Sequence, residues 1–128
     1  FASRITTKEF RMAGKTGTSQ VRNISEKEHA RGVTANEDLE WKRRDHALFL
    51  NFAPYDDPKI AVAVVVEHGG GGSKAAAPIA RDITLQALYE GEPPLDAYPE
   101  EDRAKIARQQ RELQQMQPDL STARKGRA

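Results

Sequence analysis

The sequence predicts an α+β fold in which three antiparallel strands form one sheet and a C-terminal helix packs on that sheet. Two short apolar segments, 46–53 and 60–66, flank a turn rich in proline and aspartate, which is typical of a hairpin. A further strand is expected at 13–21, and a segment with helical spacing of its apolar residues lies at 74–89. These observations favour a small mixed domain that continues into a charged helical tail.

The first strand is expected at residues 13–21. The two-residue period of a strand places Thr16 and Thr18 on one face. Lys15 and Gly17 then share the opposite face. Glycines weaken a strand and are tolerated where a ligand or another backbone must come close, so this strand is a candidate for the border of a binding site.

The connection from residue 22 to residue 45 is long and polar, with many Glu, Arg, Asn and Lys side chains. A connection of this length in a compact domain is usually functional or disordered. Residues 36–41 are the best candidate for a short helix within it.

The second and third strands are expected at 46–53 and 60–66. The prolines and aspartates of residues 54–58 end one strand before the next begins. Residues 60–66 are continuously apolar and β-branched, a pattern that predicts a strand covered on both faces. The short turn makes the two strands an antiparallel hairpin.

A run of glycines at 69–72, followed by Ser73, predicts a flexible turn that leads into a helix at 74–89. Pro78 fits the first turn of this helix, where its missing N–H does no harm. Gly91 then ends the helix. The apolar stripe expected to lie on the sheet consists of Ala76, Ile79, Ala80, Ile83, Ala87 and Leu88.

The composition changes after Glu92, where two prolines interrupt the chain. Residues 99–117 are charged and glutamine-rich, which predicts a solvent-exposed helix followed by a frayed basic end. We therefore divide the chain into a domain portion at 1–92 and a charged, partly helical tail at 93–128. Because the tail has few large apolar side chains, we expect its removal to leave the stability of the domain nearly unchanged.

Composition excludes several classes of function. The net charge of the 128 residues is +1, so bulk electrostatics gives no sign of nucleic-acid binding. The absence of cysteine rules out disulfides and thiolate metal sites. The longest apolar run, 60–66, is far shorter than the roughly 20 residues that span a bilayer. The chain begins with Phe1 and not with methionine, which suggests a piece of a larger protein.

The most informative run is residues 13–19, which combines a cation, hydroxyl groups and two glycines. Its Gly-Lys-Thr segment also ends a phosphate-binding loop, but that loop requires a glycine where this chain has Glu9, whose carboxylate would repel a phosphate. Lys15-Thr16-Gly17 is instead one of three motifs that surround an acylated serine, the others being S-x-x-K and S-x-N. No serine of this chain has a lysine three residues later or an asparagine two residues later. The run therefore predicts one wall of an acyl-transfer site without its nucleophile.

Several segments together resemble one family. Residues 12–21 are similar to the Lys-Thr-Gly region of class B penicillin-binding proteins. The resemblance covers about residues 1–92 and is strongest to the cell-elongation transpeptidases of the penicillin-binding protein 2 type. It is continued, in chain order, by the segments 45–49, 52–54, 58–67 and 77–82.

This resemblance implies the last three strands of a five-stranded antiparallel sheet, with the strand of Lys15 at the edge that lines the catalytic cleft. It implies cross-linking of peptidoglycan stem peptides through a serine acyl-enzyme, with β-lactam antibiotics as suicide substrates and no cofactor. The implied partners are the rest of the parent transpeptidase and cell-elongation proteins. The implied location is the periplasm, in a parent protein anchored to the bacterial inner membrane by an anchor outside this chain.

The resemblance also assigns roles to single residues. Lys15 supplies positive potential beside the cleft. The hydroxyls of Thr16 and Thr18 donate to the substrate carboxylate, and the backbone N–H of Thr18 forms half of the oxyanion hole. Gly17 leaves room for the substrate along the strand. Lys15 and Thr18 are therefore the expected catalytic residues, and Thr16, Gly17 and Thr18 the expected substrate-binding residues.

Other features leave alternatives open. His29, His46 and His68 lack the spacing of a metal site, so we expect His46 to be a structural strand residue and the other two to be exposed. The glycines at 69–72 could cradle an anion, but a strand-to-helix turn is the simpler interpretation. The competing function is a non-catalytic interaction module that docks a partner through the long polar connection or the tail. Without its parent, the chain is expected to be inactive.

Overall fold

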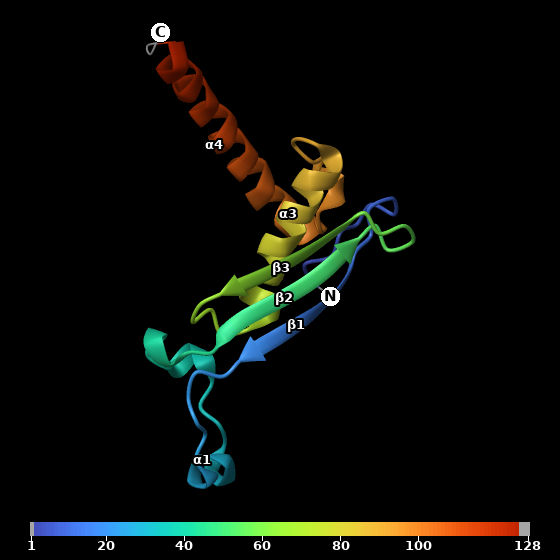
Figure 1. Cartoon of the computed structure of the whole chain (residues 1–128). Coiled ribbons are helices and arrows are strands. Elements are labelled where there is room, and N and C mark those ends of the chain that lie inside the picture. Colours follow the sequence, from blue (N-terminus) through green and yellow to red (C-terminus); the bar gives the residue numbers. More distant parts are fainter. Residues whose placement is uncertain (1, 126–128) are drawn as a thin grey trace.

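The structure, a computed structural model, describes the backbone of residues 2–125 and the side chains of residues 2–116. Its centre is an antiparallel sheet with the strand order β1-β2-β3, built from β1 (Ala13–Ser19), β2 (His46–Ala53) and β3 (Ile60–Val66). Figure 1 shows the three strands side by side, with α3 (Ala77–Tyr89) and α4 (Glu100–Lys125) on one side of them. The expected α+β fold and its three strands are confirmed, with β1 ending two residues earlier than expected.

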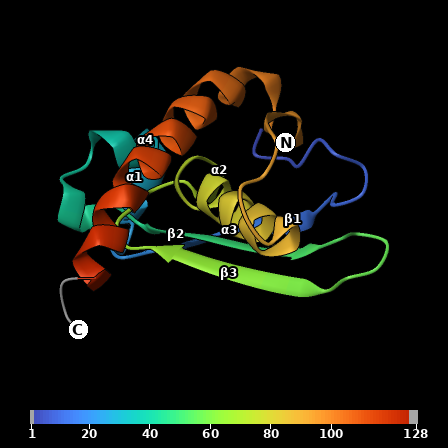
Figure 2. The same ribbon diagram turned by 90° about the horizontal axis from the view of Figure 1, so that it is seen from above.

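The helix expected after the sheet is also present. A single turn, α2 (Gly72–Ala75), leads into α3 (Ala77–Tyr89), and α3 lies across β2 and β3, as Figure 2 shows from above. Pro78 lies in the first turn of α3, as expected. Glu90 ends α3 in a left-handed conformation with a φ of 52°, one residue before the expected stop at Gly91.

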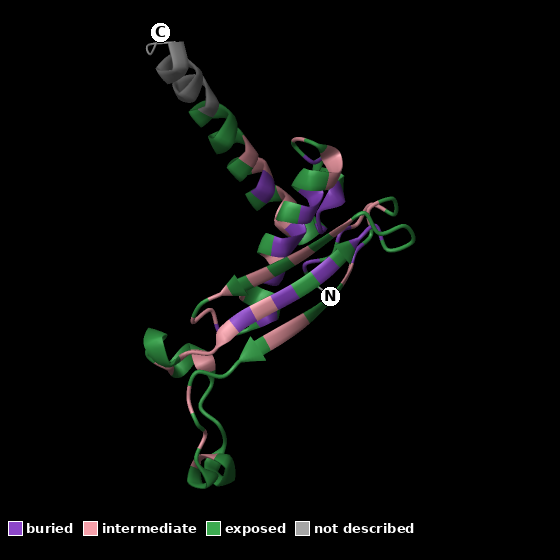
Figure 3. Cartoon of the chain, in the orientation of Figure 1, coloured by how far each residue is buried: buried purple, intermediate pink, exposed green. Residues whose placement is uncertain are grey.

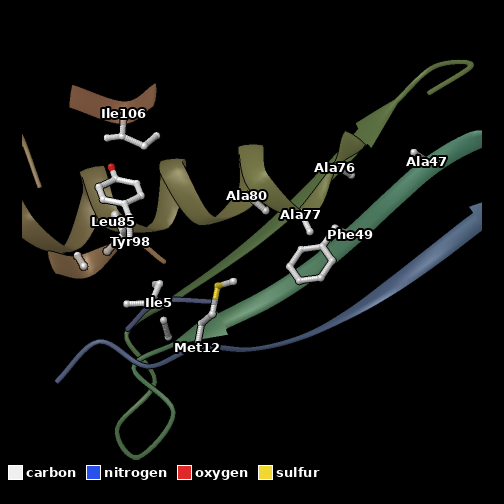
Figure 4. Packing of buried hydrophobic residues seen from close by; sticks show 12 residues of the cluster. Ile5, Met12, Ala47, Phe49, Ala76, Ala77, Ala80, Leu85, Tyr98 and Ile106 are labelled. Atoms are coloured by element: carbon white, nitrogen blue, oxygen red, sulfur yellow. The ribbon is translucent and has the colours of Figure 1, made fainter. Parts of the chain in front are cut away.

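The core lies between α3 and one face of the sheet. Along β2, buried residues alternate with more exposed ones, so that Phe49 points toward Ala77 and Ala80 of α3 (Figures 3 and 4). The small side chains of α3 let the helix approach the sheet closely. The buried apolar cluster comprises Ile5, Met12, Ala47, Phe49, Ala53, Ala76, Ala77, Ala80, Leu85, Ala97, Tyr98 and Ile106.

A polar contact lies inside this core. Asn51 on β2 is buried, and its Nδ2 donates to Oγ1 of Thr84 at 2.8 Å. Thr84 in turn donates to the carbonyl of Ala80 at 2.7 Å. Because a buried polar group needs a partner, this chain of hydrogen bonds favours one position of α3 along β2.

The opposite face of the sheet is left uncovered by the described residues. Leu50, Phe52 and Val65 are 57%, 38% and 62% exposed. The continuous apolar run of β3 predicted a strand covered on both faces, and for this chain that expectation is wrong, because β3 alternates between half-buried and exposed residues. Burial of such apolar surface under another layer is energetically favourable, because it removes the surface from water.

After Glu92 the chain returns to the body of the molecule. Tyr98 and Ile106 are 4% and 6% exposed. The backbone N–H of Thr6 donates to the carbonyl of Ala97, at the end of a short turn, η3 (Leu95–Ala97), at 3.0 Å. The solvent-exposed helix expected over 99–117 is therefore wrong at Ile106, which is buried against the body of the molecule.

An ion pair holds the beginning of α4 (Glu100–Lys125) to α3. The buried guanidinium of Arg81 contacts the carboxylate of Asp102 at 2.5 Å and that of Asp82 at 2.9 Å. It also lies 5.1 Å from the ring centre of Tyr98, and burial raises the pKa of the Tyr98 hydroxyl to about 12. The neutral ring and two carboxylates thus surround a cation that would otherwise be unpaired in the core.

Beyond Ile106, α4 projects away from the sheet, as Figure 1 shows. Its side chains still donate from Gln110 to the carbonyl of Pro93 at 2.8 Å and from Gln114 to the carboxylate of Glu92 at 2.9 Å. Leu113 and Met116 are 60% and 62% exposed, so the expected solvent-exposed helix is confirmed for this part. The helix continues to Lys125, and the last three residues of the expected frayed basic end lie outside the described residues. None of the described helices has the length and hydropathy needed to cross a bilayer.

The connection between β1 and β2 contains three short elements. They are α1 (Glu26–Arg31), η1 (Asn36–Asp38) and η2 (Trp41–Arg43), and none of them has a buried residue. The short helix expected at 36–41 is thus replaced by two 3₁₀ turns. The side chain of Ser25 caps α1 by accepting a hydrogen bond from the N–H of Glu28 at 3.3 Å.

Candidate functional site

The strand β1 carries the predicted site residues along one side of the sheet. Within the described part of the chain, β1 pairs only with β2, and its other edge is free. Lys15 is opposite Leu50 in the register, so it belongs to the uncovered face. Thr16 is opposite the buried Phe49 and belongs to the face of α3. The predicted division of the strand into two faces is therefore confirmed.

Lys15 is exposed, and its Nζ donates to the carbonyl of Thr16 at 2.9 Å. No carboxylate of the described residues forms an ion pair with this ammonium. Thr16 and Gly17 are half-buried and Thr18 is exposed. A free cation, two hydroxyls and an open backbone edge thus lie within four consecutive residues, an arrangement that suits the binding of an extended anionic peptide.

The two glycines of the motif differ in what surrounds them. A Cβ on Gly14 would lie 2.5 Å from Cζ of Phe49 and 2.9 Å from the carbonyl oxygen of Leu50, so packing alone requires glycine there. A Cβ on Gly17 would have Leu48 Cβ as its nearest neighbour, at an ordinary 3.4 Å. Internal packing therefore does not require glycine at residue 17.

Gly72 packs against the two strands that carry the site, and the sequence did not predict this close contact. A Cβ on Gly72 would lie 2.4 Å from the carbonyl oxygen of Leu48, 3.0 Å from that of Gly17 and 3.2 Å from Cβ of Thr16. The glycine run, expected to be a flexible turn, thus includes a residue packed tightly against β1 and β2. The run itself was the only available signal, and it does not distinguish close packing from flexibility.

A hollow of about 380 Å³ lies on the uncovered face next to Lys15. Its walls are mostly apolar and come from the beginning of β1, the second half of β2 and the beginning of β3. The residues that line it are Ala13, Gly14, Lys15, Leu50, Asn51, Phe52 and Ala61. An ammonium beside an apolar wall is less well solvated than one in open water, which strengthens its attraction for an anion.

Beyond Ser19 the chain is fastened by two polar contacts. Arg22 and Glu28 form a two-pronged ion pair with both N–O distances at 2.8 Å, and this contact lowers the pKa of the Glu28 carboxyl. Asp45 accepts from the backbone N–H of Val21 at 3.2 Å. The exit of β1 and the start of β2 are thus tied together, which holds the end of the candidate site.

The histidines have structural partners. His46 Nδ1 accepts from the backbone N–H of His68 at 2.9 Å, and Nδ1 of His68 lies 3.0 Å from the carbonyl of Arg44. His46 is therefore a structural strand residue, and His29 is exposed, and both were expected. His68 was expected to be exposed, but it is half-buried. Among the described residues, no group of three metal-ligating side chains comes together.

Comparisons with known proteins bear on this strand. Residues 2–85 match the sequence model of the penicillin-binding protein transpeptidase domain family. The peptidoglycan D,D-transpeptidase MrdA of Haemophilus influenzae is 40% identical over 89 residues, which are 70% of this chain and 13% of that protein. MrdA of Acinetobacter baumannii is 44% identical over 79 residues, which are 59% of this chain and 11% of that protein.

A solved complex between penicillin-binding protein 2 and MreC from Helicobacter pylori gives a structural match with a TM-score of 0.44 and 37% identity. The match covers 62% of this chain and 12% of that chain. The chain therefore spans only 11 to 13% of the length of these relatives.

Proposed function

Because the chain belongs to the family of penicillin-binding protein transpeptidase domains, we propose that it forms the Lys-Thr-Gly wall of the acyl-transfer site in a peptidoglycan D,D-transpeptidase. The observation that supports this most directly is the free edge of β1, where Lys15 is exposed and unpaired by any described carboxylate. The proposed substrates are peptidoglycan stem peptides, and β-lactam antibiotics would react at the same site.

The chemistry of acyl transfer explains why this strand suits the role. A stem peptide ends in a carboxylate, and attack on its last peptide bond creates a second negative charge on the carbonyl oxygen. We assign Lys15 to the positive potential that both charges require, and the hydroxyls of Thr16 and Thr18 to the carboxylate. The backbone N–H of Thr18 would donate to the oxyanion, and Gly17 would let the peptide lie along β1.

The nucleophile of the proposed reaction belongs to the rest of the parent protein. No serine of this chain is part of an S-x-x-K motif, so the serine and its lysine must come from outside these residues. The uncovered apolar face around Leu50 and Phe52 supports this division, because it borders Lys15 and offers a surface for another layer of the parent domain. In this proposal the isolated chain is inactive.

The experiment that tests the proposal compares the chain with its parent. Each protein is incubated with a penicillin and examined by intact-mass spectrometry. The parent is expected to gain the mass of one antibiotic, and the 128-residue chain to gain none. A parent that forms no adduct would refute the function, and an adduct on the isolated chain would refute the placement of the nucleophile outside it.

The wider biology of the parent is also part of the proposal. We place the parent in the bacterial periplasm, anchored to the inner membrane, with cell-elongation proteins as partners. These assignments follow from the family and from the relatives that are named peptidoglycan D,D-transpeptidases. No contact within the described residues bears on them.

A second candidate function is a docking module without catalysis. The exposed Leu113 and Met116 on the projecting part of α4 favour it, because apolar side chains on a free helix commonly meet a partner. The same penicillin experiment separates the two functions, since a docking module predicts no acylation of the parent.

A further inference from the structure

Trp41 is the single tryptophan of the chain and is 57% exposed. It lies in η2, within the connection that leaves β1 and enters β2. Figure 1 shows the second half of this connection near the end of the sheet where β1 finishes. Its ring centre is 4.5 Å from that of His68, which in turn is 4.7 Å from that of His46. An exposed aromatic ring that other rings support from behind is a feature of binding surfaces.

The segment that carries Trp41 is fastened by hydrogen bonds. Asn36 and Asp45 exchange two of them, with Asp45 N to Asn36 Oδ1 at 2.8 Å and Asn36 Nδ2 to Asp45 Oδ2 at 3.2 Å. Nε of Arg44 donates to the carbonyl of Leu39 at 3.0 Å. The backbone N–H of Gly70 donates to the backbone carbonyl of Asp45 at 2.9 Å. The ring is therefore held in one place before any ligand arrives, which lowers the entropic cost of binding.

A polar cavity of about 320 Å³ is lined in part by the segment that carries Trp41, at residues 35–37 and 44, and by the residues that follow His68. Arg44 lines the cavity and bonds to His68 through its carbonyl, and Gly69 lines it directly after His68 in the chain. The cavity offers both donors and acceptors of hydrogen bonds, and its lining includes the exposed ion pair Lys74–Glu37 at 2.5 Å. Its polar lining consists of Asn36, Glu37, Arg44, Ser73 and Lys74.

The charges of residues 37–44 around Trp41 cancel. Three acidic side chains at residues 37, 38 and 40 accompany three basic ones at residues 42, 43 and 44. A site with an aromatic platform, balanced charge and a cavity of mixed donors and acceptors suits a ligand that is uncharged, rich in hydroxyl or amide groups, and flat on one side. A pyranose sugar has these properties, because its axial C–H groups pack on the negative face of an indole.

We propose that Trp41 and the polar cavity bind a sugar of the glycan strand from which the stem peptide extends. The inference rests on the proposed function, because it names a further part of the same substrate. The sugar ring would lie on the open face of Trp41, and its hydroxyl and acetamido groups would reach the polar lining around Arg44 and Lys74.

The position of Trp41 relative to β1 supports this assignment. With the terminal carboxylate held at Thr16 and Thr18, a peptide that pairs with β1 antiparallel, as β2 does, leaves the strand past Ser19. Its sugar-bearing end therefore points to the end of the sheet where Trp41 lies. At about 3.3 Å per residue, four extended residues cover about 13 Å, which is enough to pass Ser19.

A membrane surface is the main competing ligand, because tryptophan with neighbouring lysine and arginine is also found at lipid interfaces. The acidic residues 37, 38 and 40 argue against this, since they would meet anionic headgroups at the same place as Lys42 and Arg43. The sugar is therefore the ligand that the charges favour.

The test uses the purified parent transpeptidase and its Trp41→Ala and Trp41→Phe variants. Tyr55→Ala is the matched control, because Tyr55 is a similarly exposed aromatic at 52% in the turn between β2 and β3, away from Trp41. Turnover is measured with stem peptides attached to a glycan strand and with free stem pentapeptide, and acylation is measured with penicillin. For Trp41→Ala we expect about a tenfold rise in KM for the glycan-linked substrate alone, with partial rescue in Trp41→Phe.

Direct binding is measured with chitotetraose, a stem-free N-acetylated oligosaccharide, and with vesicles of phosphatidylglycerol. Chitotetraose is expected to change the fluorescence of the wild type but not that of Trp41→Phe. Vesicle binding that depends on Trp41, without oligosaccharide binding, would overturn the sugar assignment, as would equal KM values for the glycan-linked substrate. An equal loss with free pentapeptide and penicillin would show that Trp41 is only structural. Absence of penicillin acylation in the wild type would instead refute the proposed function.

Discussion

Lys15 is the residue whose chemistry is most open to test in the parent enzyme. Its ammonium is exposed at the free edge of β1 and has no carboxylate partner among the described residues. Removing one well-placed electrostatic group from such a site costs on the order of 100-fold in rate. We therefore expect Lys15→Ala to slow penicillin acylation by about that factor, measured by stopped-flow kinetics with a fluorescent penicillin.

The control for this prediction is Thr18→Ser, which keeps the hydroxyl and the backbone N–H and should reduce the acylation rate far less. Thermal unfolding of both variants is measured alongside, so that a loss of folded protein is not mistaken for slow chemistry. Equal acylation rates for the wild type and Lys15→Ala would refute the role assigned to this cation.

Gly72 allows a sharper test of packing, because its neighbour Gly71 is a natural control. A Cβ on Gly72 would lie 2.4 Å from the carbonyl oxygen of Leu48, whereas a Cβ on Gly71 would meet nothing within 4 Å. We expect Gly72→Ala to destabilise the parent by about 1–3 kcal/mol, seen as a lower Tm. Gly71→Ala has an ordinary φ of −88° and should leave the Tm unchanged. Similar Tm values for the two variants would show that α2 simply moves away from β1.

At the same scale, some residues were predictable and others were not. The faces of Lys15 and Thr16 followed from the two-residue period of a strand, which depends only on local geometry. The role of Gly72 depends on an approach to Leu48, 24 residues earlier in the chain, and nothing local reports such a contact. The buried pair of Asn51 and Thr84 was missed for the same reason.

At the scale of elements, the hairpin of β2 and β3 and the helix α3 were predictable from apolar patterns. The coverage of the two faces of β3 was not predictable. A continuous apolar run shows that both faces of a strand can be buried, but it does not show which layers bury them. In the described residues one layer is α3, and the other face is open. The two 3₁₀ turns of the long connection were also beyond prediction, since they depend on the exchange of hydrogen bonds between Asn36 and Asp45.

The ion pair of Arg22 and Glu28 makes the order of α1 depend on pH. The hydrogen bond from Arg22 lowers the pKa of Glu28 below its ordinary value of 4.5. A lowered pKa in the folded state stabilises that state above pH 4.5, and this stabilisation is lost as the pH falls through the folded-state pKa. We therefore expect limited proteolysis within residues 22–34 of the parent to accelerate below pH 4.5, assayed with an acid-active protease.

The control variant for this pH dependence is Glu28→Gln, which keeps the shape of the side chain but cannot lose a charge. Its proteolysis is expected to be faster than that of the wild type at pH 7 and to change little with pH. A pH profile in Glu28→Gln that matches the wild type would assign the effect to other carboxylates.

At the scale of the whole molecule, residues 95–106 belong to the packed body. Truncation after Glu92 removes the buried Tyr98 and Ile106 and leaves the guanidinium of Arg81 without Asp102. Loss of a single buried isoleucine side chain typically costs 2–5 kcal/mol. We therefore expect this truncation to lower the Tm of the parent clearly, contrary to the expectation from the sequence.

Truncation after Met116 is the matched control. The side chains of Leu113 and Met116 are already exposed, so removal of the residues that follow should leave the Tm unchanged. An unchanged Tm in both truncated proteins would return the domain boundary to residue 92. The docking of residues 95–106 was not predictable from the sequence, because it depends on Tyr98, Ile106 and the arginine of α3, and these do not form an apolar stripe.

The uncovered face of the sheet finally determines how the chain behaves when it is produced by itself. β3 has seven consecutive residues without charge, proline or glycine, and one of its edges is unpaired among the described residues. Segments of this kind stack into cross-β aggregates. We expect the isolated chain to accumulate in inclusion bodies, and Val65→Lys, which puts a charge on this face, to raise the soluble fraction of a cell lysate, whereas Val33→Lys in the exposed connection should not. The uncovered face beside the proposed site is thus expected to stay soluble only when another layer of the parent protein covers it.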